Sequence, residues 1–344
     1  MENLSVFERI NENLESLEID EIVELLGPLK IGMEVHTPII PSGEFLYRGR
    51  KIDSDFSKEN GITISDLTYP PAEKAKLGRL NRDGSPIFYC SASKEVVFFE
   101  IPDLTDGDEI ILSYWQTSER MVVNNIGYTQ SLFDKLGAKR ECPIWSVGEN
   151  QQGNAHQEII SDPDSFTPNM IEKALSRDEN SAIRQAFSDA FMCEVGLGER
   201  HRYKLSTAIG ELHLGEIVNS TVEFSGVMYP TMRMWANSDN LALLPAFVDK
   251  NVEFRMSMHV RIDSKTENKF SITKIDSSIK VSDDGTLNWL GRLPNWTLGP
   301  ESGFALVVAT TGRDKFGDYT IGQDGTPLHW VFTDQSTGNV IEPS

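Results

Sequence analysis

The sequence GRLNRDGSPIFYCSASKEVVFFEI, residues 78–101, carries the features around which the chain is organised. It opens with two arginines and an asparagine on a polar loop and turns at Asp83-Gly84. A short apolar run follows, and a second apolar segment ends in Glu100. A carboxylate delivered by an apolar segment is costly unless it has a partner or a role. We therefore predict that Glu100 is catalytic and that the loop before it binds an anionic cofactor.

The sequence alone does not fully determine the secondary structure of residues 78–101. Ile87 to Cys90 is predicted to be a short strand. Ser93 to Ile101 favours a helix with Ser93 as its N-cap, although the β-branched and aromatic residues Val96 to Phe99 also suit a strand. In either case, Tyr89 and Glu100 share a pocket only if the fold brings them together.

Composition limits the classes of function that the chain can have. Its 344 residues, 39% hydrophobic and 24% charged, are typical of a soluble globular protein. The formal net charge of −20 argues against nucleic acid or an anionic membrane as a partner, because both bind basic surfaces. No apolar run is long enough to span a membrane, and the acidic N-terminal sequence does not resemble a signal peptide. A cytoplasmic location is expected.

The three cysteines, Cys90, Cys142 and Cys193, lie far apart in the sequence. They fit neither a disulfide framework nor a paired-cysteine metal site, so we expect buried thiols in a reducing compartment and predict no metal. His213 has no second histidine or carboxylate at metal-ligand spacing, which favours a surface histidine or one satisfied within the fold over a metal ligand.

The rest of the chain predicts a mixture of helices followed by a β-rich C-terminal part. From residue 252 onward, apolar and polar residues alternate between turns, which is typical of an antiparallel meander. The predicted helices are 3–27, ended by Gly27-Pro28, then 128–136, 167–195 and 205–217, and the predicted strands before the meander are 45–47, 109–115, 120–123, 222–228 and 241–247.

Several short motifs, in this order, resemble those of the RES-domain family, named for its arginine, glutamate and serine. The series is Leu46-Tyr47-Arg48-Gly49-Arg50, Tyr69-Pro70-Pro71, Gly78-Arg79-Leu80-Asn81, Ile87-Phe88-Tyr89-Cys90-Ser91, Phe99-Glu100 and Gly226-Val227-Met228-Tyr229-Pro230-Thr231. Thr231 stands where the family has serine, which keeps the hydroxyl and adds a methyl group. The resemblance covers about residues 44–250.

The resemblance implies an α+β fold with an ADP-ribosyltransferase-like core of two small sheets that grip NAD in a cleft. We therefore expect a helical N-terminal extension at 1–40, a RES domain at 41–250 with a helical insertion at about 102–200, and a β-rich extension at 251–344. Members of the family are toxins that destroy NAD and are restrained by an antitoxin protein, and they commonly form dimers. Some members instead transfer ADP-ribose to a protein.

The resemblance also implies roles for single residues in cleaving the nicotinamide–ribose bond of NAD. Glu100 would stabilise the positively charged transition state, and Thr231 would form a hydrogen bond near the nicotinamide. Arg48 and Arg79 would clamp the diphosphate, and Tyr89 would stack on the nicotinamide or the ribose. Asn81 and Tyr47 complete the expected NAD-binding set. Water, phosphate or a protein side chain could be the acceptor, and a non-catalytic NAD-binding or interaction module is the alternative from a different class.

Overall fold

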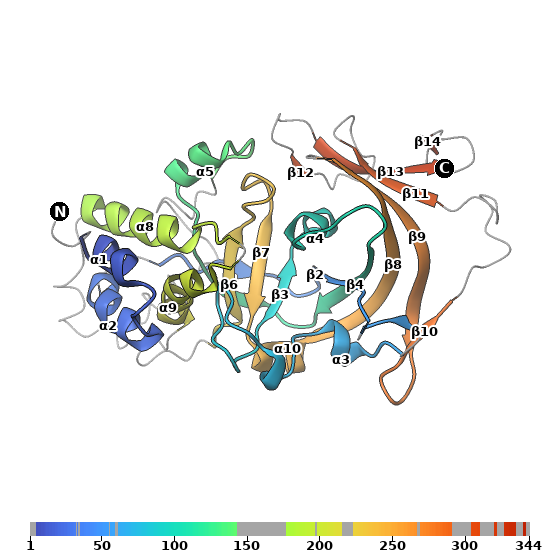
Figure 1. Cartoon of the computed structure of the whole chain (residues 1–344), viewed down its shortest axis with the longest axis horizontal. Coiled ribbons are helices and arrows are strands. Elements are labelled where there is room, and N and C mark those ends of the chain that lie inside the picture. The colour runs from blue at the N-terminus through green and yellow to red at the C-terminus, as the bar shows by residue number, and fades with distance from the viewer. Residues whose placement is uncertain are drawn as a thin grey trace.

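The computed structural model describes residues 5–142, 177–214 and 223–290, apart from 32, 34, 55, 59, 60, 197, 267 and 268, together with four strands between 304 and 341. Within these residues the protein is a mixed α+β structure in which helices flank one mixed sheet (Figure 1). The helices are α1 (Ser5–Asn13), α2 (Ile19–Lys30), α3 (Ile64–Leu67), α4 (Lys94–Glu100), α5 (Gln130–Leu136), α8 (Arg177–Phe191), α9 (Tyr203–Leu214) and α10 (Pro245–Asn251).

The strands follow one another across the sheet in an order different from their order in the chain. The order is β1-β5-β6-β7-β3-β2-β4-β8-β9-β11-β13-β12, with β10 beside β9 and β14 beside β13. The strands are β1 (Ile39–Ile40), β2 (Phe45–Lys51), β3 (Phe88–Ser91), β4 (Glu109–Thr117), β5 (Met121–Asn125), β6 (Gly226–Pro230), β7 (Asp239–Leu243), β8 (Val252–Thr266), β9 (Lys269–Val281), β10 (Leu287–Trp289), β11 (Phe304–Ala309), β12 (Thr320–Ile321), β13 (Pro327–Asp334) and β14 (Val340–Ile341).

The sheet is weakest between β2 and β3. These two strands pair only at Tyr47 and Ser91, whereas β2 pairs with β4 along its whole length and β3 pairs fully with β7. We call this junction the seam. It separates a first half-sheet, made of β1, β5, β6, β7 and β3, from a second half-sheet that begins with β2, β4, β8 and β9. A seam with little backbone pairing leaves polar groups on both strand edges that side chains or a ligand can satisfy.

The first half-sheet is covered on one face by α1, α2, α8 and α9 (Figure 1). Alternation along its strands separates two cores: Tyr89 and Ala242 face these helices, whereas Phe88, Cys90 and Leu241 face the opposite core. The fully buried Phe187 and Phe191 of α8 anchor the helical layer. The helical layer therefore covers the face of the sheet on which Tyr89 and Ala242 lie.

Helix α4 packs in the hollow of the second half-sheet (Figure 1). Its Val96, Val97 and Phe98 are buried against residues of β4, β8 and β9. A Cβ on Gly49 of β2 would lie 2.3 Å from Val97 Cγ1, so only glycine lets the helix approach this closely. The apolar residues Val96 to Phe99, which also suited a strand, therefore lie in a helix. Their burial orients this helix and, with it, Glu100 at its last position.

Most predicted elements before residue 252 match helices or strands of the structure, with three corrections. In place of one helix at 3–27 the described residues form two, α1 and α2, and α2 continues through Pro28 to Lys30 because Leu29 extends its buried face. The strand predicted at 222–228 is β6, which begins at Gly226 and continues through Tyr229 and Pro230. The predicted strand 241–247 ends at Leu243, where Pro245 begins α10. The first part of the predicted helix 167–195 lies outside the described residues.

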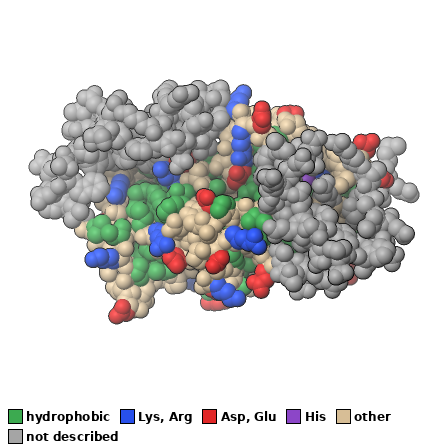
Figure 2. All heavy atoms as spheres, turned by 180° about the vertical axis from the view of Figure 1, so that it is seen from behind, with side chains coloured by type: hydrophobic (Ala, Val, Ile, Leu, Met, Phe, Trp, Pro, Cys, Tyr) green, Lys and Arg blue, Asp and Glu red, His purple; other side chains and the backbone are tan. Residues whose placement is uncertain are grey.

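The predicted antiparallel meander after residue 252 is confirmed by β8, β9 and β10. Because β8 pairs with β4, these strands continue the second half-sheet. Across the described residues, no helix is long and apolar enough to cross a membrane. Over the described part of the rear face, basic and acidic side chains are interspersed and do not gather by sign (Figure 2).

Candidate active site at the seam of the sheet

Glu100 lies half-buried at the last position of α4, beside the seam. Its Oε1 accepts hydrogen bonds from the hydroxyl of Thr231 and from Nδ2 of Asn240, the latter at 2.9 Å. Its other carboxylate oxygen has no partner within the described parts of the chain. The carboxylate is therefore fixed through one oxygen while the second is left for a ligand.

Thr231 is fully buried and begins the turn that joins β6 to β7. The turn is closed by backbone hydrogen bonds from Thr231 N to Ser238 O and from Ala236 N to Thr231 O. Trp235 and Ala236 have φ values of 52° and 59°. Such left-handed conformations are unfavourable for residues with a Cβ and persist only where the surroundings hold them.

Arg140 supplies that restraint from the segment after α5. Its guanidinium forms a two-pronged ion pair with Asp239, at 2.5 and 2.9 Å, and also donates to the carbonyls of Ala236 and Ser238. The Tyr128 hydroxyl donates to the same Asp239 carboxylate at 2.6 Å. Burial, with this carboxylate beside it, raises the pKa of Tyr128 well above its ordinary value, so it stays a hydrogen-bond donor.

We expect Arg140→Ala to destabilise the protein by about 2–4 kcal/mol, because it leaves Asp239 and two carbonyls without a charged donor. Urea unfolding measures this loss. The control is Arg255→Ala, which breaks an ion pair with Glu253 whose partners are about half exposed (47% and 56%). That variant should cost less than about 1 kcal/mol. Equal losses in the two variants would contradict the anchoring role of Arg140.

Asn240 and Ser91 are buried polar residues that sequence reasoning missed. Ser91 Oγ donates to Asn240 Oδ1 at 2.8 Å, which directs the amide NH2 group toward Glu100. Ser91 therefore fixes the orientation of the amide, and Asn240 fixes the carboxylate. Asn240, next to Asp239 and directly before the apolar residues 241–243 of β7, was the available signal, but pairing it with Glu100 requires the fold.

Arg48 extends from β2 across the seam, where its Nη1 donates to the carbonyl oxygen of Tyr89 in β3 at 2.7 Å. The guanidinium lies 5.7 Å from the ring centre of Phe88. Burial lowers the pKa of Arg48 to about 10, which still leaves it charged at neutral pH. Its Nε is buried and makes no hydrogen bond to any described residue. A buried charged donor with unused capacity is suited to an anionic or polar ligand.

Tyr89 and Asn81 hold the loop before β3 in place. The Tyr89 hydroxyl donates to Asn81 Oδ1 at 2.9 Å and accepts from the Leu80 amide at 2.8 Å. Asn81 Nδ2 in turn donates to the carbonyls of Lys76 and Arg82. The polar atoms of both side chains are thus engaged within the loop, and burial raises the pKa of Tyr89.

Arg79 reaches across to the end of α8. Its guanidinium donates to the carbonyls of Phe191 and Cys193, and it lies 5.6 Å from the Phe191 ring centre and 5.9 Å from that of Tyr203. The expected role of Arg79 as a diphosphate clamp stays a prediction. In this structure the side chain ties the loop to the helical layer.

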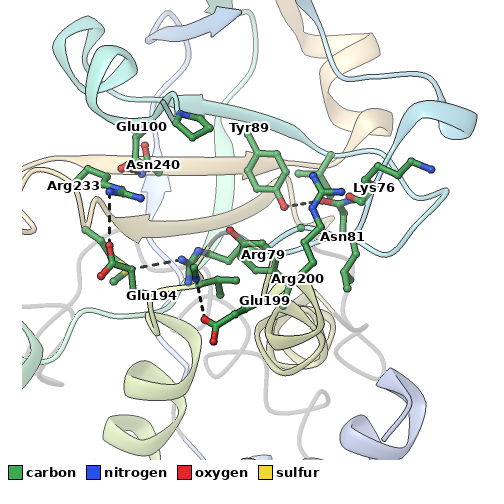
Figure 3. Close-up of a pocket in the computed structure, with 18 of the residues that line it drawn as sticks. Lys76, Arg79, Asn81, Tyr89, Glu100, Glu194, Glu199, Arg200, Arg233 and Asn240 are labelled. Carbon is green, nitrogen blue, oxygen red and sulfur yellow. Dashed lines mark hydrogen bonds and ion pairs between the residues drawn. The ribbon is translucent and has the colours of Figure 1, made fainter. Parts of the chain in front are cut away.

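A cavity of about 920 Å³ joins these residues (Figure 3). Predicted site residues that line it are Arg48, Arg79, Asn81, Tyr89 and Glu100. Thr231 lies behind Glu100 and does not line the cavity. Tyr47 lines a neighbouring cavity of about 400 Å³ that shares Arg48, Tyr89 and Glu100 with the first, and its ring contacts Tyr114 edge-on at 5.1 Å.

The remaining predicted chemical groups lie away from this cavity or inside the fold. His213 is buried, its Nδ1 lies 2.8 Å from the carbonyl of Ile209, and burial lowers its pKa to about 3. This confirms a histidine satisfied within the fold. Cys90 and Cys142 are buried free thiols as predicted, whereas Cys193 is partly exposed. Among the described residues, no group of three or more histidine, cysteine or acidic side chains could hold a metal ion.

Comparison of the chain with protein-family models, curated proteins and solved structures found no match.

Proposed function

We propose that the protein cleaves the nicotinamide–ribose bond of NAD, as a glycohydrolase or a phosphorylase. The observation that carries this proposal is a carboxylate, Glu100, held through one oxygen by Thr231 and Asn240 in a cavity that it shares with a buried, charged Arg48. This combination of a fixed anion and a nearby cation suits a substrate that develops positive charge at one atom and carries phosphates at another.

The chemistry fits the free oxygen of Glu100. Breaking the bond between nicotinamide and ribose passes through an oxocarbenium-like state, as does glycoside cleavage. A negative charge fixed in advance stabilises that state without the cost of reorganising at the moment of reaction. The electron pair of the broken bond leaves with the nicotinamide nitrogen, which becomes neutral. The acceptor then forms the new bond to the ribose carbon.

The proposed ADP-ribosyltransferase-like core is supported by the seam. Two half-sheets that pair only at Tyr47 and Ser91, with a cavity beside them, correspond to the split sheet expected of such a core. In this proposal Arg48, Tyr89 and Tyr47 contribute to NAD binding from the two sides of the seam. The proposal extends to a toxin or defence effector, which acts in the cytoplasm, forms a dimer and is restrained by an antitoxin protein.

Purified protein incubated with NAD, with and without inorganic phosphate, tests the proposal. We expect free nicotinamide to appear together with ADP-ribose in water, or with ADP-ribose 1″-phosphate if phosphate is the acceptor. Label transferred from NAD to protein would instead support a protein ADP-ribosyltransferase. NAD that binds but stays intact under every condition would contradict the enzyme and favour a non-catalytic module.

Thr231 offers a test of the hydroxyl that holds Glu100. Thr231→Ser keeps the donor and should retain nearly wild-type nicotinamide release. Thr231→Val keeps the shape but leaves the carboxylate with one donor fewer. A hydrogen bond to a charged group contributes about 1.5–3 kcal/mol, so we expect the valine variant to be about 10- to 100-fold slower. Two variants of equal activity would show that the hydroxyl has no part in the reaction.

A further inference from the structure

The cavity has two chemically different ends (Figure 3). Glu100 and Asn240 lie at one end, where Arg233 forms an ion pair with Glu194 at 3.7 Å. Lys76 and Arg200 lie toward the other end, on the far side of Tyr89 (Figure 3). The charge of Arg233 at the first end is thus partly neutralised by Glu194.

Arg200 and Lys76 are the cations at the second end, and neither side chain has a partner in the described part of the chain. Arg200 precedes α9 and is exposed in the cavity wall, and its guanidinium forms no hydrogen bond or ion pair with a described residue. Its side chain extends toward the Asn81 loop (Figure 3). The chain has 52 acidic residues against 32 lysines and arginines, so an arginine left unpaired in a cavity is notable. Guanidinium groups are the preferred clamps for phosphate oxygens.

The sequence suggests Arg79 for binding the phosphates, but its guanidinium already forms hydrogen bonds within the protein. Its guanidinium is used by the carbonyls of Phe191 and Cys193 and is enclosed by two aromatic rings. Binding a diphosphate through Arg79 would require those contacts to break, whereas Arg200 can bind an anion without losing any.

We propose that Arg200, assisted by Lys76, binds the diphosphate of a dinucleotide whose reactive ribose lies against Glu100. This inference deepens the proposed function and rests on it for the identity of the ligand. The cavity of about 920 Å³ lies within the range of about 300–1,000 Å³ that is usual for ligand sites. Arg200 lies outside every motif that resembles the RES-domain family, so it could be assigned only from the fold.

The test compares Arg200→Gln with Arg202→Gln by calorimetric titration of ADP-ribose and of adenosine. The Arg202→Gln substitution removes the same charge two residues away. Arg202, however, forms an ion pair with Glu199 and does not line this cavity. We expect Arg200→Gln to weaken ADP-ribose binding about tenfold, the loss of one charge-assisted hydrogen bond. Adenosine binding should be unchanged, Arg202→Gln should resemble the wild type, and Arg200→Lys should recover part of the affinity.

Equal ADP-ribose affinity in the two glutamine variants would overturn the inference, as would a wild-type protein that does not bind ADP-ribose. Inorganic phosphate that binds through Arg200 when ADP-ribose is already bound would also overturn it, because the arginine would then serve a separate anion. The two proposals fail separately. Loss of ADP-ribose affinity in Arg200→Gln alone, with no nicotinamide release by the wild type, would sustain the diphosphate site and reject the NAD-cleaving activity.

Discussion

Glu100→Gln should lower the turnover of NAD about 10³-fold while leaving its binding and the stability of the protein close to wild type. The glutamine oxygen can still accept from Thr231 and Asn240, so the local hydrogen bonds survive. What is lost is the negative charge that faces the developing oxocarbenium ion. Removing a single fixed electrostatic contact in an active site typically costs about 10²–10³ in rate, and a carboxylate opposite a full positive charge lies at the upper end. Single-turnover release of nicotinamide measures the effect.

Glu73→Gln is the matched control, because Glu73 is an exposed carboxylate outside the cavity. It should not change the rate. If Glu100→Gln released nicotinamide as fast as this control, the carboxylate would be a structural anchor for the turn at Thr231 and no part of the chemistry. If Glu100→Gln unfolded at lower urea concentration than the control, the rate comparison would be repeated with Glu100→Asp. That variant keeps the charge and shortens the side chain.

The sequence predicted that Glu100 belongs to a site, but it could not show which residues form hydrogen bonds with its carboxylate. A carboxylate at the end of an apolar segment indicates an acid that is at least partly withdrawn from solvent, and Glu100 lies half-buried at the end of α4. Its partners come from 131 and 140 residues further along the chain, and no local pattern encodes which distant strand lies opposite. The motifs that resemble the RES-domain family supplied Thr231. Asn240 belongs to no such motif and became visible only when β7 was placed beside β3.

The arginines show a different limit. Residue type alone cannot distinguish a guanidinium that is free for a ligand from one that is used by the protein's own carbonyls. The motifs in the sequence favour Arg79 over Arg200, yet in the structure it is Arg79 that donates to the carbonyls at the end of α8. Gly49 is similar. Its place between two arginines does not indicate that Val97 of α4 packs against it, which only the structure shows.

Arg48→Ala should abolish the growth arrest that we expect when the wild-type protein is expressed in a bacterial host. It should also reduce nicotinamide release by at least about 10²-fold, in the range seen when one preorganised donor is removed. The reason is that Arg48 acts at two places. It closes the seam through the carbonyl of Tyr89, and it lines the cavity as a buried side chain that is charged at neutral pH. Viable counts after induction and release of nicotinamide measure the two effects.

Arg50→Ala separates the charge of Arg48 from the general charge of β2. Arg50 lies two residues along the same strand, but it donates to the carbonyl of Asp66 and stacks on Phe56 at 3.9 Å, outside the larger cavity. Arrest should therefore persist in Arg50→Ala. Arrest that also persisted in Arg48→Ala would reject the toxin, because the substitution removes a cation that the proposed site requires. Loss of arrest in both variants, at equal protein levels, would mean that the substitutions act by destabilising β2. The loss of arrest would then follow the unfolding midpoint of each variant and not its rate of NAD cleavage.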